Sequence, residues 1–159
     1  MTPRVTVLQL DTDFPRIAGD VGAAESYARP PQIIRIAGAS VGRIVTDRPQ
    51  DIDIAPFEEA LTQATGDIVV TSCGFLSYWQ EHLAAVAQRP FIASSLVSLN
   101  SLAQRYKPEE LCILTFDAAR LGPAHLGARA EYARSLLGLK VSHHLRQIIT
   151  GNLDHLDPQ

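Results

Sequence analysis

An apolar run that passes directly into a helical pattern stands at the centre of this chain, in the segment DIVVTSCGFLSYWQEHL. Ile68–Val70 has the β-branched composition of a buried strand. Apolar residues then recur at helical spacing, at Phe75, Leu76, Trp79 and Leu83. A strand joined to a helix by a short polar turn is the unit from which parallel α/β sheets are built.

The same alternation extends along most of the chain. The apolar, β-rich runs predict strands at residues 4–11, 33–36, 43–46, 68–71, 90–93, 110–115 and 139–143. Helical periodicity, with Pro in some first turns, predicts helices at residues 55–64, 74–87, 95–106 and 123–137. This order predicts an α/β fold, a parallel-sheet three-layer sandwich.

Composition restricts the class of protein further. With 159 residues, 46% hydrophobic and 19% charged, the chain has the composition of one ordinary globular domain. A net charge of -3 offers no basic surface for nucleic acid. No apolar run approaches the roughly 18 residues of a membrane span, and the N-terminus is charged too early for a signal peptide. Two cysteines form no disulfide framework, so we expect a cytoplasmic enzyme or binding domain.

Small polar residues follow four of the predicted strands. In open parallel sheets, ligands bind beyond the carboxyl ends of the strands, so these residues are expected to share one working edge. They are Asp11-Thr12, Thr71-Ser72-Cys73, Ala93-Ser94-Ser95 and Thr115-Phe116-Asp117.

Cys73 is the candidate for chemistry among them. At the start of a helix, unpaired N–H groups and the helix dipole lower a thiol pKa from its free value of about 8.5. The thiolate would then serve as a base or nucleophile, with Gly74 admitting a close approach. Thr71 and Ser72 add hydroxyl donors, and Asp11 adds a carboxylate. The alternative is that Cys73 is a small residue packed in a tight turn.

The remaining candidates favour structural roles. Cys112 lies within the apolar run LCILT, so we expect it in the core. His143 and His144 are adjacent on a predicted strand, so they would point to opposite faces. No metal-ligand spacing or phosphate-binding glycine motif occurs, and we expect neither a metal nor a cofactor. Ser72 and Ser94 lack the elbow of a serine hydrolase.

Four segments in order carry a resemblance to a known family: LDTDFPRIAGDVG, VVTSCGFLSYWQEHLA, PFIASSLVSL and LCILTFDAARLGPAHL. Over residues 7–126 the chain resembles the aspartate/glutamate/hydantoin racemase superfamily, specifically its members with a TSCGF segment. The resemblance implies two similar α/β lobes with the active site between them, here a first racemase-like lobe over residues 1–93 and a partial second lobe over residues 94–159. It also implies a cofactor-independent racemase or isomerase.

Within that resemblance, Cys73 matches the thiol that removes a proton from the carbon next to a carboxylate or hydantoin carbonyl. Asp11 matches the acidic residue that assists this thiol. The residues that would surround a small carboxylate-bearing substrate are Thr12, Thr71, Ser72, Gly74, Ser94, Ser95 and Thr115.

The chain also departs from the superfamily pattern. Members carry a second cysteine in a second lobe, and this sequence, which lacks the C-terminal part, does not contain it. The alternatives are therefore a non-catalytic carboxylate-binding or regulatory relative, or a one-thiol decarboxylase or cis–trans isomerase. An incomplete second lobe would leave apolar surface uncovered, so we expect a homodimer.

Overall fold

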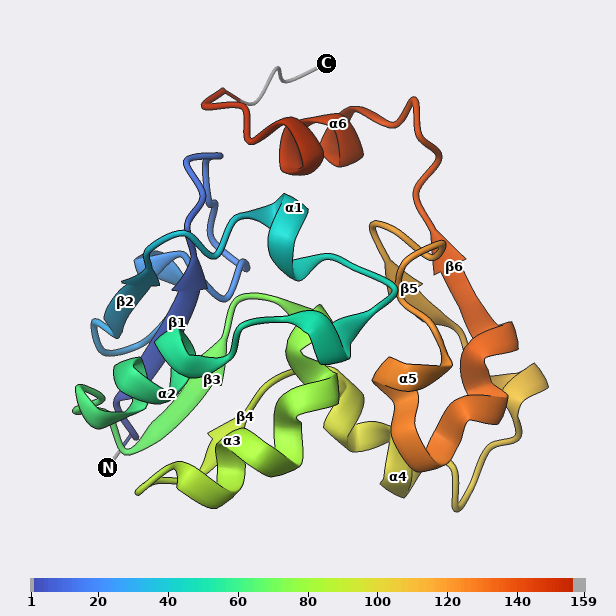
Figure 1. The fold of residues 1–159 in the computed structure, drawn as a ribbon, viewed down its shortest axis with the longest axis horizontal. Coiled ribbons are helices and arrows are strands. Elements are labelled where there is room, and N and C mark those ends of the chain that lie inside the picture. The colour runs from blue at the N-terminus through green and yellow to red at the C-terminus, as the bar shows by residue number, and fades with distance from the viewer. Residues whose placement is uncertain (1, 156–159) are drawn as a thin grey trace.

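A four-stranded parallel sheet organises the N-terminal part of the molecule (Figure 1). The computed structural model describes residues 2–155. The strands are β1 (Val5–Leu10), β2 (Gln32–Ile36), β3 (Ile68–Thr71) and β4 (Phe91–Ile92), in the spatial order β2-β1-β3-β4. Every neighbouring pair is parallel, so the carboxyl ends of all four strands meet at one edge.

A second, two-stranded parallel sheet follows in the C-terminal part. It pairs β5 (Ile113–Thr115) with β6 (Leu136–Gly138). Leu114 lies opposite Leu137 in this ladder, and their side chains are 76% and 58% exposed. One face of the small sheet is therefore apolar and uncovered within the described residues.

Short helices connect the strands and cover the first sheet. The α-helices are α1 (Val41–Ile44), α2 (Ala55–Thr62), α3 (Gln80–Val86), α4 (Leu99–Leu102), α5 (Pro123–Leu126) and α6 (His144–Gly151). The 3₁₀ segments are η1 (Ala24–Ser26), η2 (Pro49–Asp51), η3 (Gly74–Trp79), η4 (Ser95–Ser98), η5 (Pro108–Glu110) and η6 (Gly127–Ser135).

One main core unites these elements. Leu8 on β1, Phe57 on α2 and Leu83 on α3 are each fully buried in it. Ile113 of the second sheet and Ile149 of α6 pack against the same cluster. The two sheets therefore share apolar contacts, and a second, smaller cluster of Leu99, Leu126 and Tyr132 also packs against Ile113.

The predicted α/β class with a parallel sheet is confirmed. Several of the predicted helices and strands differ from the structure in type or in their boundaries. The run at 43–46 belongs largely to α1 and the residue after it, although it was expected to form a strand. The predicted helix at 123–137 ends early, because Leu136 and Leu137 pair with β5. Local propensity gave way to strand pairing there.

The end of the chain also differs from expectation. Residues 139–143 form a turn and a helix cap where a strand was predicted, and α6 follows. His143 Nδ1 accepts a hydrogen bond from Leu145 N at 3.2 Å, so this histidine caps α6. The prediction of His143 and His144 on opposite faces of a strand was wrong.

The division into lobes at residue 93 stays a prediction, although β4 closes the first sheet at Ile92. Among residues 2–155, none of the helices has the length and apolar character needed to cross a membrane.

Candidate functional site

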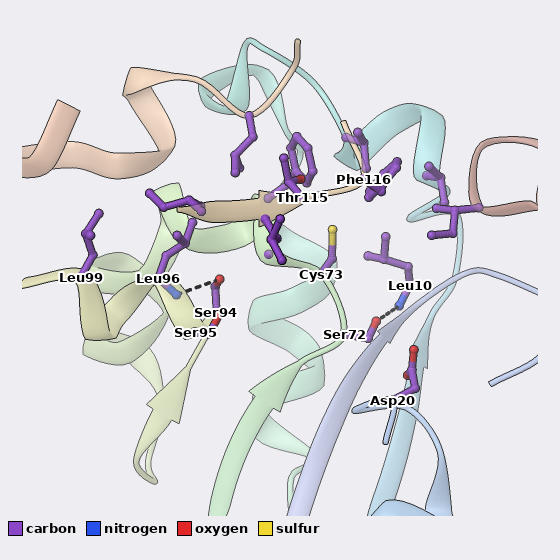
Figure 2. A pocket seen from close by; sticks show the side chains of 18 of the residues that line it. Leu10, Asp20, Ser72, Cys73, Ser94, Ser95, Leu96, Leu99, Thr115 and Phe116 are labelled. Atoms are coloured by element: carbon purple, nitrogen blue, oxygen red, sulfur yellow. Dashed lines mark hydrogen bonds between the residues drawn. The ribbon is translucent and has the colours of Figure 1, made fainter. Parts of the chain in front are cut away.

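A pocket of about 640 Å³ opens at the carboxyl ends of β1 and β3, facing β5 (Figure 2). Its wall comes from segments that are distant in the sequence. They are the end of β1 and the loop after it, α1 and the residue after it, the turns after β3 and β4, α4, β5 and the loop after it, and a residue of α6. The four-stranded sheet brings the segments after β1, β3 and β4 together, because these strands end at the same edge, and β5 of the second sheet faces them.

Cys73 lines this pocket, and its sulfur points into it in Figure 2. It follows β3 in extended conformation and precedes η3. Thr71 fixes this turn: its hydroxyl donates to the carbonyl of Ala93 at 2.6 Å and accepts from the Cys73 N–H at 3.3 Å. Thr71 itself is buried and does not line the pocket.

The electrostatic state of Cys73 is opposite to the sequence prediction. Its side chain is only 7% exposed, and burial raises the pKa of the thiol to about 11. A hydrogen bond from the Phe75 N–H and the positive charge of Arg16 both lower the pKa, without cancelling the effect of burial. The expectation of a lowered pKa at the helix start was wrong.

Several hydroxyl groups predicted for the site lie on the pocket wall, and most of them accept hydrogen bonds from backbone N–H groups. Ser72 Oγ accepts from Leu10 N at 3.1 Å and so links β3 to β1. Ser94 Oγ accepts from Leu96 N at 3.2 Å and caps η4. Both bonds are drawn in Figure 2. Ser95 is an exposed residue of the wall.

Two further predicted residues complete this part of the wall. Gly74 lines the pocket, and a Cβ added there would lie 3.4 Å from Ser94 Oγ, which is at the short end of ordinary van der Waals contact, so the turn itself does not require a glycine. Thr115 lines the opposite side from β5, where its hydroxyl accepts from Asp117 N at 3.4 Å.

Asp11 and Thr12 lie outside the pocket lining. Asp11 accepts hydrogen bonds from Gly38 N at 2.9 Å and Arg35 Nε at 2.6 Å, and both hold the pKa of its carboxyl below the usual value. Thr12 is buried and accepts from Arg16 Nη2 at 3.2 Å. The structure therefore pairs Asp11 with Arg35, away from the pocket that Cys73 lines.

Sequence reasoning missed other residues of the wall. Arg16 and Asp20 reach it from the loop after β1, and Phe14 and Phe116 add aromatic surface. The sequence did offer a signal for Arg16, because it is a basic residue in the polar segment that follows the first strand. Cys112 also lines the pocket, is exposed and precedes β5, so its assignment to the core was wrong.

No cluster of metal-ligating side chains exists among residues 2–155. The chemistry that the pocket offers comes from the buried Cys73 thiol, the exposed Cys112 thiol, the Arg16 guanidinium with its partner Asp20, several hydroxyls and apolar walls. Such a set suits the binding of a small anion and the movement of a proton at a carbon atom.

Comparison with known proteins found one informative relative. Over 126 residues the chain is 28% identical to a protein of Durusdinium sp. clade D named dimethylsulfoniopropionate lyase. The alignment covers 75% of this chain and 41% of that protein, so the chain spans about two-fifths of the relative's length. No family model matches the chain. No solved structure matches it significantly.

These findings overturn the resemblance to the racemase superfamily. The relative carries the name of a lyase, and no family model supports a racemase. The predictions of amino-acid racemase or isomerase function, of a hydantoin-type substrate and of a racemase-like lobe are corrected accordingly. What the relative indicates is similarity to an enzyme that is named as a lyase.

Proposed function

We propose that this chain carries the base of a lyase that eliminates a leaving group from a small carboxylate, with Cys73 as that base. The observation that carries the proposal is the Cys73 sulfur facing a pocket whose wall also holds a guanidinium, that of Arg16. The name of the relative supports elimination as the reaction type.

The proposed step balances without a cofactor. The Cys73 thiolate takes a proton from the carbon next to the carboxylate, and the sulfur becomes a thiol. The electrons of the broken C–H bond form a carbon–carbon double bond. The leaving group on the adjacent carbon departs with the electron pair of its own bond, and the thiol later returns its proton to water.

A sulfonium leaving group suits a site that offers a single buried thiol. It departs as a neutral sulfide and needs no proton from the protein, so one base is sufficient. Dimethylsulfoniopropionate, which the relative is named for, carries such a group. The apolar and aromatic wall around Leu96, Leu99 and Phe116 suits the methyl groups on its sulfur.

The raised pKa of Cys73, about 11, sets a requirement on this reaction. At neutral pH only about one molecule in 10⁴ would hold the thiolate in the empty pocket. The Phe75 N–H and the charge of Arg16 favour the thiolate. A bound sulfonium cation would act in the same direction, because a nearby positive charge lowers a thiol pKa. We therefore propose that the substrate promotes its own deprotonation.

The test is release of dimethyl sulfide and acrylate from dimethylsulfoniopropionate, followed by headspace chromatography and NMR. We expect activity in the unaltered protein and a loss of about 100-fold or more in Cys73→Ser, in line with the removal of a catalytic base. Ser77→Ala is the matched control, because Ser77 lies in η3, outside the pocket lining, and bonds the His125 carbonyl.

Ser77→Ala is expected to retain activity. Equal activity in Cys73→Ser and the unaltered protein would show that Cys73 is not the base. Binding of the substrate with no release of dimethyl sulfide would contradict the lyase reaction itself.

A further inference from the structure

Arg16 is a nearly buried cation on the wall of the pocket. Its side chain is 10% exposed, although arginine is seldom buried without a partner for its charge. It lies in the loop after β1 and lines the same cavity as Cys73. Its charge lowers the pKa of Cys73, so the guanidinium stands within electrostatic reach of the sulfur.

Three neighbours hold the guanidinium in place. Nη1 donates to Asp20 Oδ1 at 2.8 Å, and Nη2 donates to Thr12 Oγ1 at 3.2 Å. The guanidinium carbon lies 4.7 Å from the centre of the Phe14 ring. Gly22 passes so close that an added Cβ would lie 2.5 Å from Arg16 Cδ. The position of Arg16 is therefore set before any ligand arrives.

These contacts leave donor capacity unused. A guanidinium carries five N–H groups, and the bonds to Asp20 and Thr12 engage one N–H on each of the two Nη atoms, so each Nη keeps a second N–H. Unused donors on a buried cation favour an anionic ligand, and planar carboxylates match the guanidinium geometry.

We propose that Arg16 binds the carboxylate of the substrate and thereby presents the neighbouring carbon to Cys73. Asp20 acts as a positioning residue that holds Arg16. The inference rests on the proposed function for the identity of the substrate, a small carboxylate. Beyond the proposed function, it identifies Arg16 as the residue that makes the pocket bind a carboxylic acid more tightly than its neutral analogue.

Asp20 also lines the pocket, and its charge would repel a free carboxylate. Its Oδ1 accepts from both Arg16 Nη1 and Gly22 N, at 2.8 and 2.6 Å. These two donors offset much of that charge. Asp20 therefore fits the role of orienting Arg16 better than that of contacting the acid.

The test compares an acid with its uncharged amide, so it does not depend on turnover. Propionate and propionamide are titrated into the unaltered protein by calorimetry or by ligand-observed NMR. We expect the acid to bind about 10- to 100-fold more tightly than the amide, as the loss of a charge-assisted contact predicts. Arg16→Met should reduce this ratio to about one, and Arg16→Lys should retain part of it.

Two further variants separate binding from folding. Gly22→Ala keeps the charge of Arg16 but pushes its side chain aside, so it should lower the acid-to-amide ratio as well. Arg89→Met removes an exposed arginine that does not line the pocket and should leave the ratio unchanged. A folding defect would weaken both ligands together and would not change the ratio.

The outcomes distinguish this inference from the proposed function. If propionate does not bind, or if Arg16→Met keeps the ratio of the unaltered protein, Arg16 is not the anchor. If the ratio depends on Arg16 but no dimethyl sulfide is released, the anchor stands and the lyase reaction fails. Release of dimethyl sulfide with a ratio independent of Arg16 overturns the anchor alone.

Discussion

At the scale of single residues, Cys73 is held between opposing influences. Burial favours the neutral thiol, while the Phe75 N–H and the Arg16 charge favour the thiolate. Burial is the largest influence, and the pKa rises from 9.0 to about 11. A thiol with this pKa is a strong base once ionised and is scarce in its ionised form at neutral pH.

The first prediction concerns the pH dependence of the proposed elimination. Below a pKa of about 11 the thiolate fraction of the free protein grows with pH. The Cys73-dependent kcat/KM should therefore rise about tenfold per pH unit between roughly pH 7 and 10. The rate of Cys73→Ser, which reports elimination by hydroxide alone, is subtracted at each pH. A plateau that begins below pH 8 would contradict a raised pKa in the free protein.

The second prediction concerns stability, because a pKa difference between folded and unfolded chains makes stability depend on pH. Between pH 9.0, the ordinary pKa of this thiol, and pH 11, about its pKa in the folded chain, the folded chain keeps the Cys73 proton and the unfolded chain loses it. The buried neutral thiol therefore contributes to the free energy of unfolding. This contribution is fully present below pH 9 and is lost as the pH rises towards 11.

The expected loss of unfolding free energy is about 2 to 3 kcal/mol, measured by urea denaturation from pH 8 to 11. Cys73→Ala is the control, because it lacks the buried thiol and should lose less unfolding free energy over the same pH range. Parallel curves for the two proteins would show that burial does not raise the pKa of Cys73.

At the scale of elements, α6 links the two parts of the molecule. In Figure 1 it lies between β6 and the loops beside β1. Ile148 is 1% exposed, and Ile149 reaches the pocket wall. Near its start, Arg146 Nη2 lies 3.0 Å from Asp117 Oδ2. At its end, Asn152 Oδ1 accepts from Asp13 N at 2.7 Å. These contacts hold Ile149 at the pocket.

The third prediction tests this attachment. Asp117 is 7% exposed, so Arg146→Met would leave a buried carboxylate with the Ala119 N–H at 3.1 Å and, as its nearest remaining cation among the described residues, Arg120 at 3.7 Å. We expect a loss of about 2 to 3 kcal/mol in the free energy of unfolding, measured by urea denaturation.

Arg134→Met is the matched control for that measurement. It removes an arginine from an ion pair with Glu109 in which both side chains are 61% exposed, and should cost about 0 to 1 kcal/mol. Equal losses in the two variants would mean that the bond between Arg146 and Asp117 adds nothing beyond a surface pair.

At the scale of the whole molecule, the first sheet and its helices form a buried core, whereas the second sheet leaves Leu114 and Leu137 exposed. Large exposed apolar surface favours association. The homodimer expected from the sequence stays a prediction. Light scattering behind size exclusion should give about twice the chain mass of 17.3 kDa. A mass equal to that of one chain at high protein concentration would contradict the homodimer prediction.

The sequence by itself determined the α/β class, the strand at Ile68–Thr71 and the position of Cys73 after it. These features depend on local pattern: β-branched apolar runs, helical spacing and polar turns between them. The same locality explains the errors. Whether 43–46 or 123–137 forms a helix or a strand depends on pairing partners that are distant in sequence.

Only the tertiary structure decided the chemistry of the pocket. The pKa of Cys73 is raised because packing buries the sulfur, and burial is not a property of one segment. Arg16 reaches the pocket, while Asp11 turns away to Arg35, because of how the loop after β1 folds back. Side-chain neighbours and solvent access arise when distant segments meet, so a strand end indicates where a site lies and its packing determines what it can do.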